Sequence, residues 1–211
     1  MAAKRMSAQQ RRMEILEATV RVVARKNYDR ATMSAIAKEA RINEALIYQH
    51  FKNKQDLQVS MLDHIMEQVL QIMKAARELQ TPSLGAIRSF GRSYHRTVLL
   101  ETDKLRCVIK AITADDEKVR ERVWNIIEFF QKFIRDQLTR IIERGELDPE
   151  LDKDMTAWVI LATTWMLSIL AALDKQREVP EERVDAIVRY LERRLRPEKN
   201  PAEAQGILGQ D

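Results

Sequence analysis

The side chains best suited to recognition chemistry lie between Thr32 and Lys54. This stretch predicts two short helices joined by a tight turn, and polar side chains crowd one face of the second helix, which we expect over residues 44–51. Tyr48 and His50 can donate to phosphate oxygens, and the Gln49 amide can pair with a base edge, usually adenine. The pattern therefore predicts a helix-turn-helix whose second helix enters a DNA groove.

The ends of these helices add further candidate contacts. Thr32 and Asn43 are expected N-caps, and each cap directs free backbone N–H groups towards phosphates. Lys54 is placed to hold the DNA backbone from the other side. Glu44 could accept from a cytosine amine, stabilise its helix end or repel phosphate, and we favour the helix-end role. The expected DNA-contacting residues are Thr32, Ser34, Asn43, Glu44, Ala45, Tyr48, Gln49, His50 and Lys54.

The two helices need a small apolar core between them. Ala37 leaves room for a close crossing, and the expected core residues are Ile36, Ala40, Ile42, Ile47 and Phe51. Outside this context, Tyr48 would also suit a core and His50 would be an ordinary surface histidine.

Charge is distributed unevenly along the chain. Residues 1–54 hold 12 Lys+Arg and 5 Asp+Glu, a net charge of +7, whereas the other 157 residues hold 24 and 27, a net charge of −3. This basic quarter of the chain contains the expected helix-turn-helix, and residues 1–54 are called the reading unit below. Such a surface attracts a polyanion through phosphate neutralisation and counterion release.

Composition and periodicity predict an all-α protein of about nine helices. Apolar residues recur at helical spacing in stretches of ten to twenty-five residues, and only five glycines and five prolines interrupt them. The single cysteine, Cys107, cannot form an internal disulfide, which favours a reducing, cytoplasmic location. The amino end, Met-Ala-Ala-Lys-Arg, lacks the apolar core of a secretion signal.

The run from Met13 to Leu62 resembles the N-terminal domain of tetracycline-repressor-like (TetR) regulators. Its segment Ile42-Asn-Glu-Ala-Leu-Ile-Tyr-Gln-His-Phe-Lys-Asn-Lys54 is similar to the family's aliphatic–Ser–x–x–x–Leu–Tyr–x–His–Phe–x–x–Lys pattern. Arg41 and Asn27 stand where the family usually has glycines. If Arg41 needs a positive φ, the turn is strained by about 1 kcal/mol.

The resemblance implies a ligand-responsive homodimeric repressor on a palindromic operator. The expected domains are a helix-turn-helix DNA-binding domain over 1–54, a ligand-binding and dimerisation domain over 55–197 and a disordered tail over 198–211. A mostly apolar effector is expected between the middle helices, although the same aromatics would also suit a core. The candidate ligand contacts are Tyr94, Arg106, Trp124, Phe129, Trp158, Trp165 and Met166.

Residues 156–173 form an uncharged run of 18 residues. That length is marginal for a bilayer span, and its hydroxyls and charged flanks favour a buried helix instead. A helix apolar all round is buried on all sides. We therefore expect it to form a homodimer interface with the helix near 182–196, which places two reading helices one duplex turn apart.

Other functional classes have weaker support. The three histidines are scattered, without metal-ligand spacing, and no glycine-rich phosphate loop or nucleophile elbow is present. We therefore expect no enzyme activity, no metal and no cofactor. The alternative is a helical sensor or interaction protein that has lost specific DNA binding, for which Arg41 and Glu44 are the only support.

Overall fold

The computed structural model describes residues 6–78, 83, 85, 89, 92, 101–178 and 180–195. Within them lie eight α-helices, one short 3₁₀ helix and no strand, which confirms the all-α prediction. The apolar periodicity also predicts a helix over about 84–101, which falls largely outside the described residues, as do Tyr94 and the tail over 198–211. The helices are α1 (Ala8–Lys26), α2 (Met33–Ala40), α3 (Glu44–Tyr48), α4 (Lys54–Glu78), α6 (Thr102–Ala111), α7 (Glu117–Glu143), α8 (Lys153–Ala172) and α9 (Glu181–Leu195), with η1 at Gln176–Glu178.

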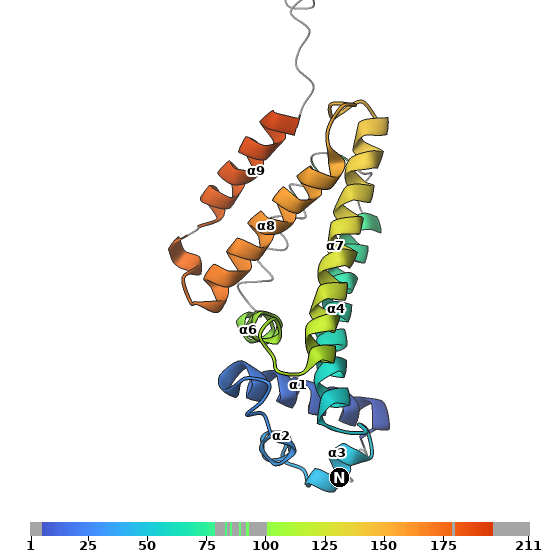
Figure 1. Ribbon diagram of the computed structural model, residues 1–211, viewed down its shortest axis with the longest axis vertical. Helices are drawn as coiled ribbons and strands as arrows, with labels where there is room; N and C mark the ends of the chain where they lie inside the picture. Colours follow the sequence, from blue (N-terminus) through green and yellow to red (C-terminus); the bar gives the residue numbers. More distant parts are fainter. Residues whose placement is uncertain are drawn as a thin grey trace, which may run out of the picture.

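The first three helices and the start of α4 share a compact apolar core. Helix α1 packs against α2 and α4, and α3 against α2 (Figure 1). The side chains of Ile15, Ile36 and Ile47 are fully buried there, and Phe51 is 2% exposed. Burying side chains of this size contributes about 1.5–3 kcal/mol each, so the core fixes the arrangement of these short helices. The predicted core residues Ala40 and Ile42 pack at its margin.

The polypeptide reverses between α2 and α3 through a left-handed residue. Arg41 has φ 56° and ψ 42°, and its N–H donates to the carbonyls of Ala37 and Lys38. A non-glycine residue is strained in this region, as the sequence predicted. Helix α3 ends at Tyr48, three residues before the expected end, because His50 N–H bonds to the Ile47 carbonyl over three residues and tightens the last turn.

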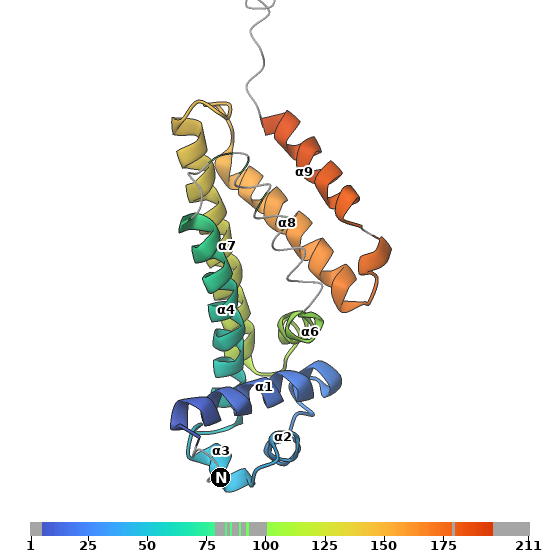
Figure 2. The same ribbon diagram turned by 180° about the vertical axis from the view of Figure 1, so that it is seen from behind.

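Helix α4 leaves the reading unit and runs through the larger part of the molecule, with α7 alongside it (Figures 1 and 2). Helix α6 lies across α1 where the two parts meet, and α8 packs against both α6 and α7. Gly145, with φ 74°, follows the end of α7 and adopts the left-handed conformation that commonly ends a helix. The Asp116 carboxylate caps the start of α7 by accepting from the backbone of Lys118 and Val119.

Helix α8 is apolar, but much of it is not covered. Among the described helices it alone is long and apolar enough to cross a membrane, with a hydropathy of 1.7, and 22% of that window is buried. Its inner side packs Ala157 and Leu161 into the protein. Its outer side exposes a stripe at helical spacing, formed by Met155, Trp158, Val159 and Met166. One face of α8 is thus covered within the chain, and the expected burial of the outer stripe against a partner copy stays a prediction.

Candidate DNA interface

Both helices of the reading unit begin at side-chain caps. Thr32 Oγ1 accepts from Ala35 N–H at 3.1 Å, and Asn43 Oδ1 accepts from Leu46 N–H at 2.8 Å. Each cap satisfies one of the four free N–H groups at a helix start. The remaining N–H groups give both helix ends a partial positive charge, which suits phosphate. Ser34, in the first turn of α2, is exposed beside them.

Helix α3 separates its side chains sharply into two faces. Ile47 is fully buried, whereas Tyr48 is 52% exposed, and Glu44, Ala45 and Gln49 are exposed as well. Packing within the chain poorly explains an exposed tyrosine at the end of a short helix whose neighbouring isoleucine is buried. The structure thus brings the predicted reader residues together on one outward face.

His50 is half-buried, and its neighbourhood includes a residue that sequence reasoning missed. The His50 carbonyl accepts from Nη1 of Arg12 at 2.8 Å, and Nη2 of Arg12 donates to Ser60 Oγ at 3.1 Å. The same guanidinium lies 4.1 Å from the centroid of the Phe51 ring. Arg12 therefore joins α1 to the end of α3 and to α4.

The ammonium group of Lys54 already donates one hydrogen bond within the chain. Its Nζ donates to the Asp29 carbonyl at 2.8 Å and so ties the start of α4 to the loop before α2. An ammonium has three donors, so two remain for a phosphate. Lys54 also borders an open cleft of about 590 Å³ between the reading unit and the α6–α7 connection. The cleft is lined by Asp29, Asn53, Lys54, Gln55, Gln58, Asp115 and Asp116.

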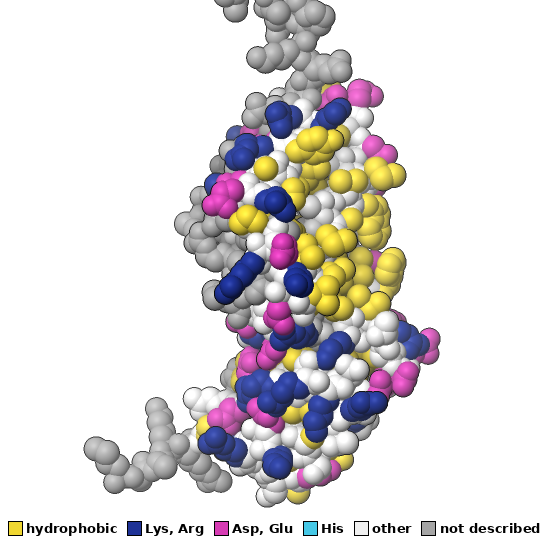
Figure 3. Space-filling model, turned by 90° about the vertical axis from the view of Figure 1, so that its left-hand side faces the viewer, with side chains coloured by type: hydrophobic (Ala, Val, Ile, Leu, Met, Phe, Trp, Pro, Cys, Tyr) yellow, Lys and Arg dark blue, Asp and Glu magenta, His cyan; other side chains and the backbone are white. Residues whose placement is uncertain are grey.

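Basic side chains gather over the lower, DNA-reading part of the molecule, and apolar side chains gather on one face above them (Figure 3). Glu39 lies among the basic residues and is neutralised. Hydrogen bonds from Arg21 and Arg25 lower the pKa of its carboxyl. The reading part therefore keeps a positive surface despite this carboxylate.

Side chains of α6 donate hydrogen bonds to backbone carbonyls in the carboxyl-terminal part of α1. Lys110 Nζ donates to the carbonyls of Val23 and Ala24, and Cys107 Sγ donates to the Val20 carbonyl at 3.3 Å. The carbonyl end of a helix carries partial negative charge, which the ammonium offsets. Burial raises the pKa of the Cys107 thiol to about 12, so this group stays protonated and can donate. No local sequence pattern indicates these contacts, which join α6 to α1 across more than 80 residues of the chain.

A second junction connects α1 with α4 and α6. The ring of His64, which is 4% exposed, lies 2.7 Å from a Glu17 carboxylate oxygen. Lys104 Nζ is 3.9 Å from the same oxygen. The hydrogen bond with His64, followed by the charge of Lys104, lowers the pKa of Glu17 against the effect of burial.

The candidate ligand contacts do not line one described pocket. Trp124 and Phe129 on α7, and Trp158 and Met166 on α8, are between 41% and 56% exposed. Trp165 packs against the main core, and Tyr94 lies outside the described residues. Arg106 forms a two-point ion pair with Asp174 at 2.7 and 2.8 Å and donates to the Ala172 carbonyl at 3.2 Å. Their role in effector binding stays a prediction.

The described residues contain no cluster of three or more His, Cys, Asp or Glu side chains that could hold a metal ion. With its outward polar face and capped helix ends, the α2–turn–α3 unit defines a helix-turn-helix DNA-binding regulator. Residues 15–61 match the profile of the family described as bacterial regulatory proteins, tetR family. The reading unit of this chain therefore matches the DNA-binding domain of that family of transcriptional regulators.

Known proteins resemble the chain well beyond the reading unit. A fatty acid metabolism regulator protein of Bacillus subtilis is 25% identical over 163 residues, which cover 74% of this chain and 84% of the relative. The regulator TtgR of Pseudomonas putida is 27% identical over 161 residues, covering 74% and 77%. The solved structure of the regulator FadR from Bacillus subtilis in complex with stearoyl-CoA has a TM-score of 0.70 at 21% identity, covering 86% and 95%. The predicted family and fold are thus confirmed.

Proposed function

We propose that this protein is a homodimeric, cytoplasmic repressor that binds a palindromic operator and is released by a small, mostly apolar effector. The observation that carries the proposal is the division of α3 between a fully buried Ile47 and an outward Tyr48 that is 52% exposed. The outward residues supply donors and acceptors for phosphates and base edges. The division into 1–54 and 55–197 remains our prediction, since Lys54 already belongs to α4.

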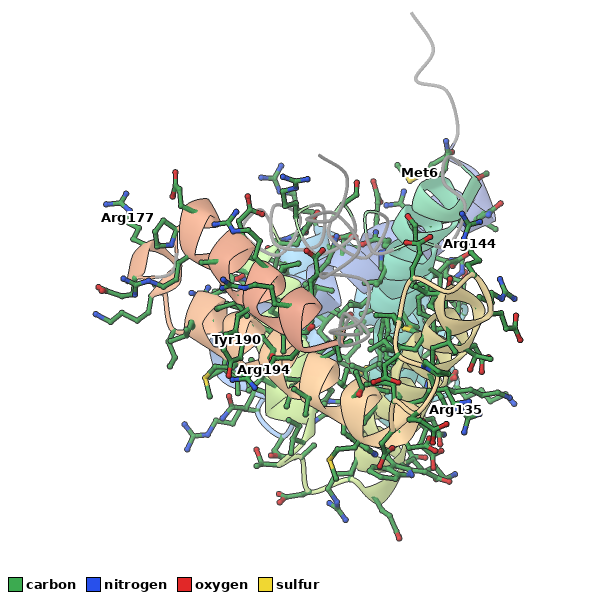
Figure 4. The ribbon with its side chains drawn as sticks, turned by 90° about the horizontal axis from the view of Figure 1, so that it is seen from above. Met6, Arg135, Arg144, Arg177, Tyr190 and Arg194 are labelled. Atoms are coloured by element: carbon green, nitrogen blue, oxygen red, sulfur yellow. The ribbon has the colours of Figure 1, made fainter. Side chains whose placement is uncertain are left out.

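The exposed face of α8 supports a dimer. On α7, which packs against α8, the candidate effector contacts Trp124 and Phe129 are also exposed in the single chain. Apolar patches of this kind mark interaction surfaces. On α9, Tyr190 is 55% exposed with the Arg194 guanidinium 5.8 Å from its ring centroid (Figure 4). We propose that α8 and α9 of two copies form the interface, which leaves two reading helices facing successive major grooves.

The effector class rests on the relatives and on the apolar character of the larger part. The relative with the solved complex binds stearoyl-CoA, so a long-chain acyl thioester is the first effector to test. In the described conformation both carboxylate oxygens of Asp174 accept from Arg106, so an effector that binds this guanidinium has to compete with Asp174. A ligand can shift the protein between two forms only by its difference in affinity for them.

The test of DNA binding starts with selection from a random duplex library, followed by titration of the selected site and a scrambled duplex. We expect a two-fold symmetric site, with half-sites about one duplex turn apart, bound by two protein copies. Binding equal to that of the scrambled duplex would favour the alternative, a sensor that has lost specific DNA binding. Lys54→Ala should lower the slope of log affinity against log salt by about 0.9 if the two spare donors of Lys54 reach a phosphate.

The test of release adds stearoyl-CoA to the protein–operator complex, with coenzyme A alone as the matched control. We expect the acyl thioester to dissociate the complex at concentrations where coenzyme A does not. Equal effects of the two compounds would exclude an acyl-chain effector. The dimer is checked separately by native mass spectrometry, which measures the oligomeric state. Trp158→Glu should shift the protein from dimer towards monomer. The control variant Glu150→Gln, at another exposed position, should leave the dimer unchanged.

A further inference from the structure

Arg12 connects three elements whose relative placement sets the direction of the reading helix. It projects from α1, donates to the His50 carbonyl just after α3 and donates to Ser60 on α4. Its guanidinium also lies 4.1 Å from the Phe51 ring centroid. A planar guanidinium can form two directed hydrogen bonds and stack on an aromatic face at the same time, whereas a lysine ammonium cannot reproduce that fork.

Helix α3 needs such an attachment because it is very short. It has five residues, fewer than two turns, and isolated helices of this length do not hold together in water. Its start is fixed by the Asn43 cap and its middle by the buried Ile47. Arg12 supplies the contact at its other end, immediately beside the outward residues Tyr48 and Gln49.

We propose that Arg12 is a positioning residue for operator recognition, holding the carboxyl end of α3 at a fixed angle to α1 and α4. This inference rests on the proposed function. Base edges are read by directed hydrogen bonds that depend on where the side chains of α3 lie, whereas attraction to phosphates is independent of sequence. Loss of the Arg12 fork therefore weakens binding to the operator much more than binding to unrelated DNA.

The contact to Ser60 gives the same residue a link to α4. Since α4 continues from the reading unit into the larger part of the molecule, a shift of α4 changes the distance between Ser60 and the guanidinium. Such a shift also changes the position of the His50 carbonyl, because the other nitrogen of the same guanidinium donates to it. Arg12 is thus placed to act on α3 through the polypeptide backbone, without touching a base.

The experiment compares Arg12→Lys with Arg11→Lys in the full chain. Both changes keep the charge, but Arg11 pairs only with the neighbouring Glu14 at 2.7 Å in the described structure. The ratio of operator to scrambled-duplex affinity is measured at several salt concentrations, well below each variant's melting temperature. We expect Arg12→Lys to lower that ratio by about tenfold, equivalent to about 1.4 kcal/mol, and Arg11→Lys to leave it within twofold.

Two further variants separate positioning from other roles. Ser60→Ala should lower the ratio in the same direction by a smaller factor, and combining it with Arg12→Lys should add little, because both remove one connection. Arg12→Gln should leave the salt slope unchanged, whereas a direct phosphate contact would lower it by about 0.9. A lower melting temperature with an unaltered affinity ratio would show a purely stabilising role and overturn the proposal.

The outcome for the wild-type chain keeps the two proposals apart. If the wild-type chain shows no preference for any selected duplex, the proposed function fails. If it does prefer one and Arg12→Lys retains that preference in full, only the positioning role of Arg12 is overturned.

Discussion

Replacing Arg41 with glycine should stabilise the protein. Arg41 is exposed and adopts φ 56° and ψ 42° between α2 and α3. A residue with a Cβ atom in this region costs roughly 1–2 kcal/mol, which glycine avoids. Glycine gives back about 0.4–1 kcal/mol because it has more freedom in the unfolded chain. The expected net gain is about 0.5–1 kcal/mol, or roughly 1–4 °C in melting temperature for a chain of this size.

The matched control is Arg41→Ala, which removes the same charge and side chain but keeps the Cβ atom. Urea unfolding and thermal unfolding are measured for the three proteins at one pH and salt concentration. We expect the free energy of unfolding of Arg41→Gly to exceed that of Arg41→Ala, and we expect the alanine variant to be about as stable as the wild type. Equal gains in both variants would trace the effect to the lost charge and refute the conformational reasoning.

Three other perturbations have defined outcomes. Gln49→Ala should relax preference at one base position by about 1–3 kcal/mol, and an unaltered selected site would remove Gln49 from the readers. Cys107, with its pKa raised to about 12 and no exposure, should resist alkylation at pH 8 until urea unfolds the chain; rapid labelling of folded protein would contradict its burial. Because the pKa of Glu17 is lowered, its contribution to stability is present above its usual value of 4.5 and is lost as acidification passes the folded value. Glu17→Gln should therefore flatten the acid side of the stability curve, and an unchanged curve would be evidence against the Glu17–His64 contact.

The reading unit was predictable from sequence because its signals are local. The Thr32 and Asn43 caps act within three residues, and the alternation of buried Ile47 with outward Tyr48 follows from helical periodicity. Arg41 stands where the resembling family usually has glycine, and the structure gives it the positive φ on which the expected strain depended. Arg12 was missed because its partners lie 38 and 48 residues away, and nothing in the neighbouring sequence indicates that separation.

The larger part was less predictable for a related physical reason. Aromatic residues at helical spacing indicate an apolar surface, but not what covers it. Trp124 and Trp158 were expected at the effector and are 51% and 43% exposed in the single chain. Arg106, another candidate effector contact, pairs with Asp174, which lies 68 residues away. Long-range pairing of this kind depends on the fold as a whole.

The hydrogen bonds from α6 to α1 affect the design of chimaeric regulators that carry this reading unit. The Lys110 ammonium donates to the Val23 and Ala24 carbonyls in the last turn of α1, and the Cys107 thiol donates to the Val20 carbonyl one turn earlier. A cut placed at residue 54 would therefore remove donors to α1 that lie far downstream in the sequence. A reading unit that is transferred to another protein should therefore be transferred together with α6. Otherwise it needs other hydrogen-bond donors for the carbonyls at the end of α1.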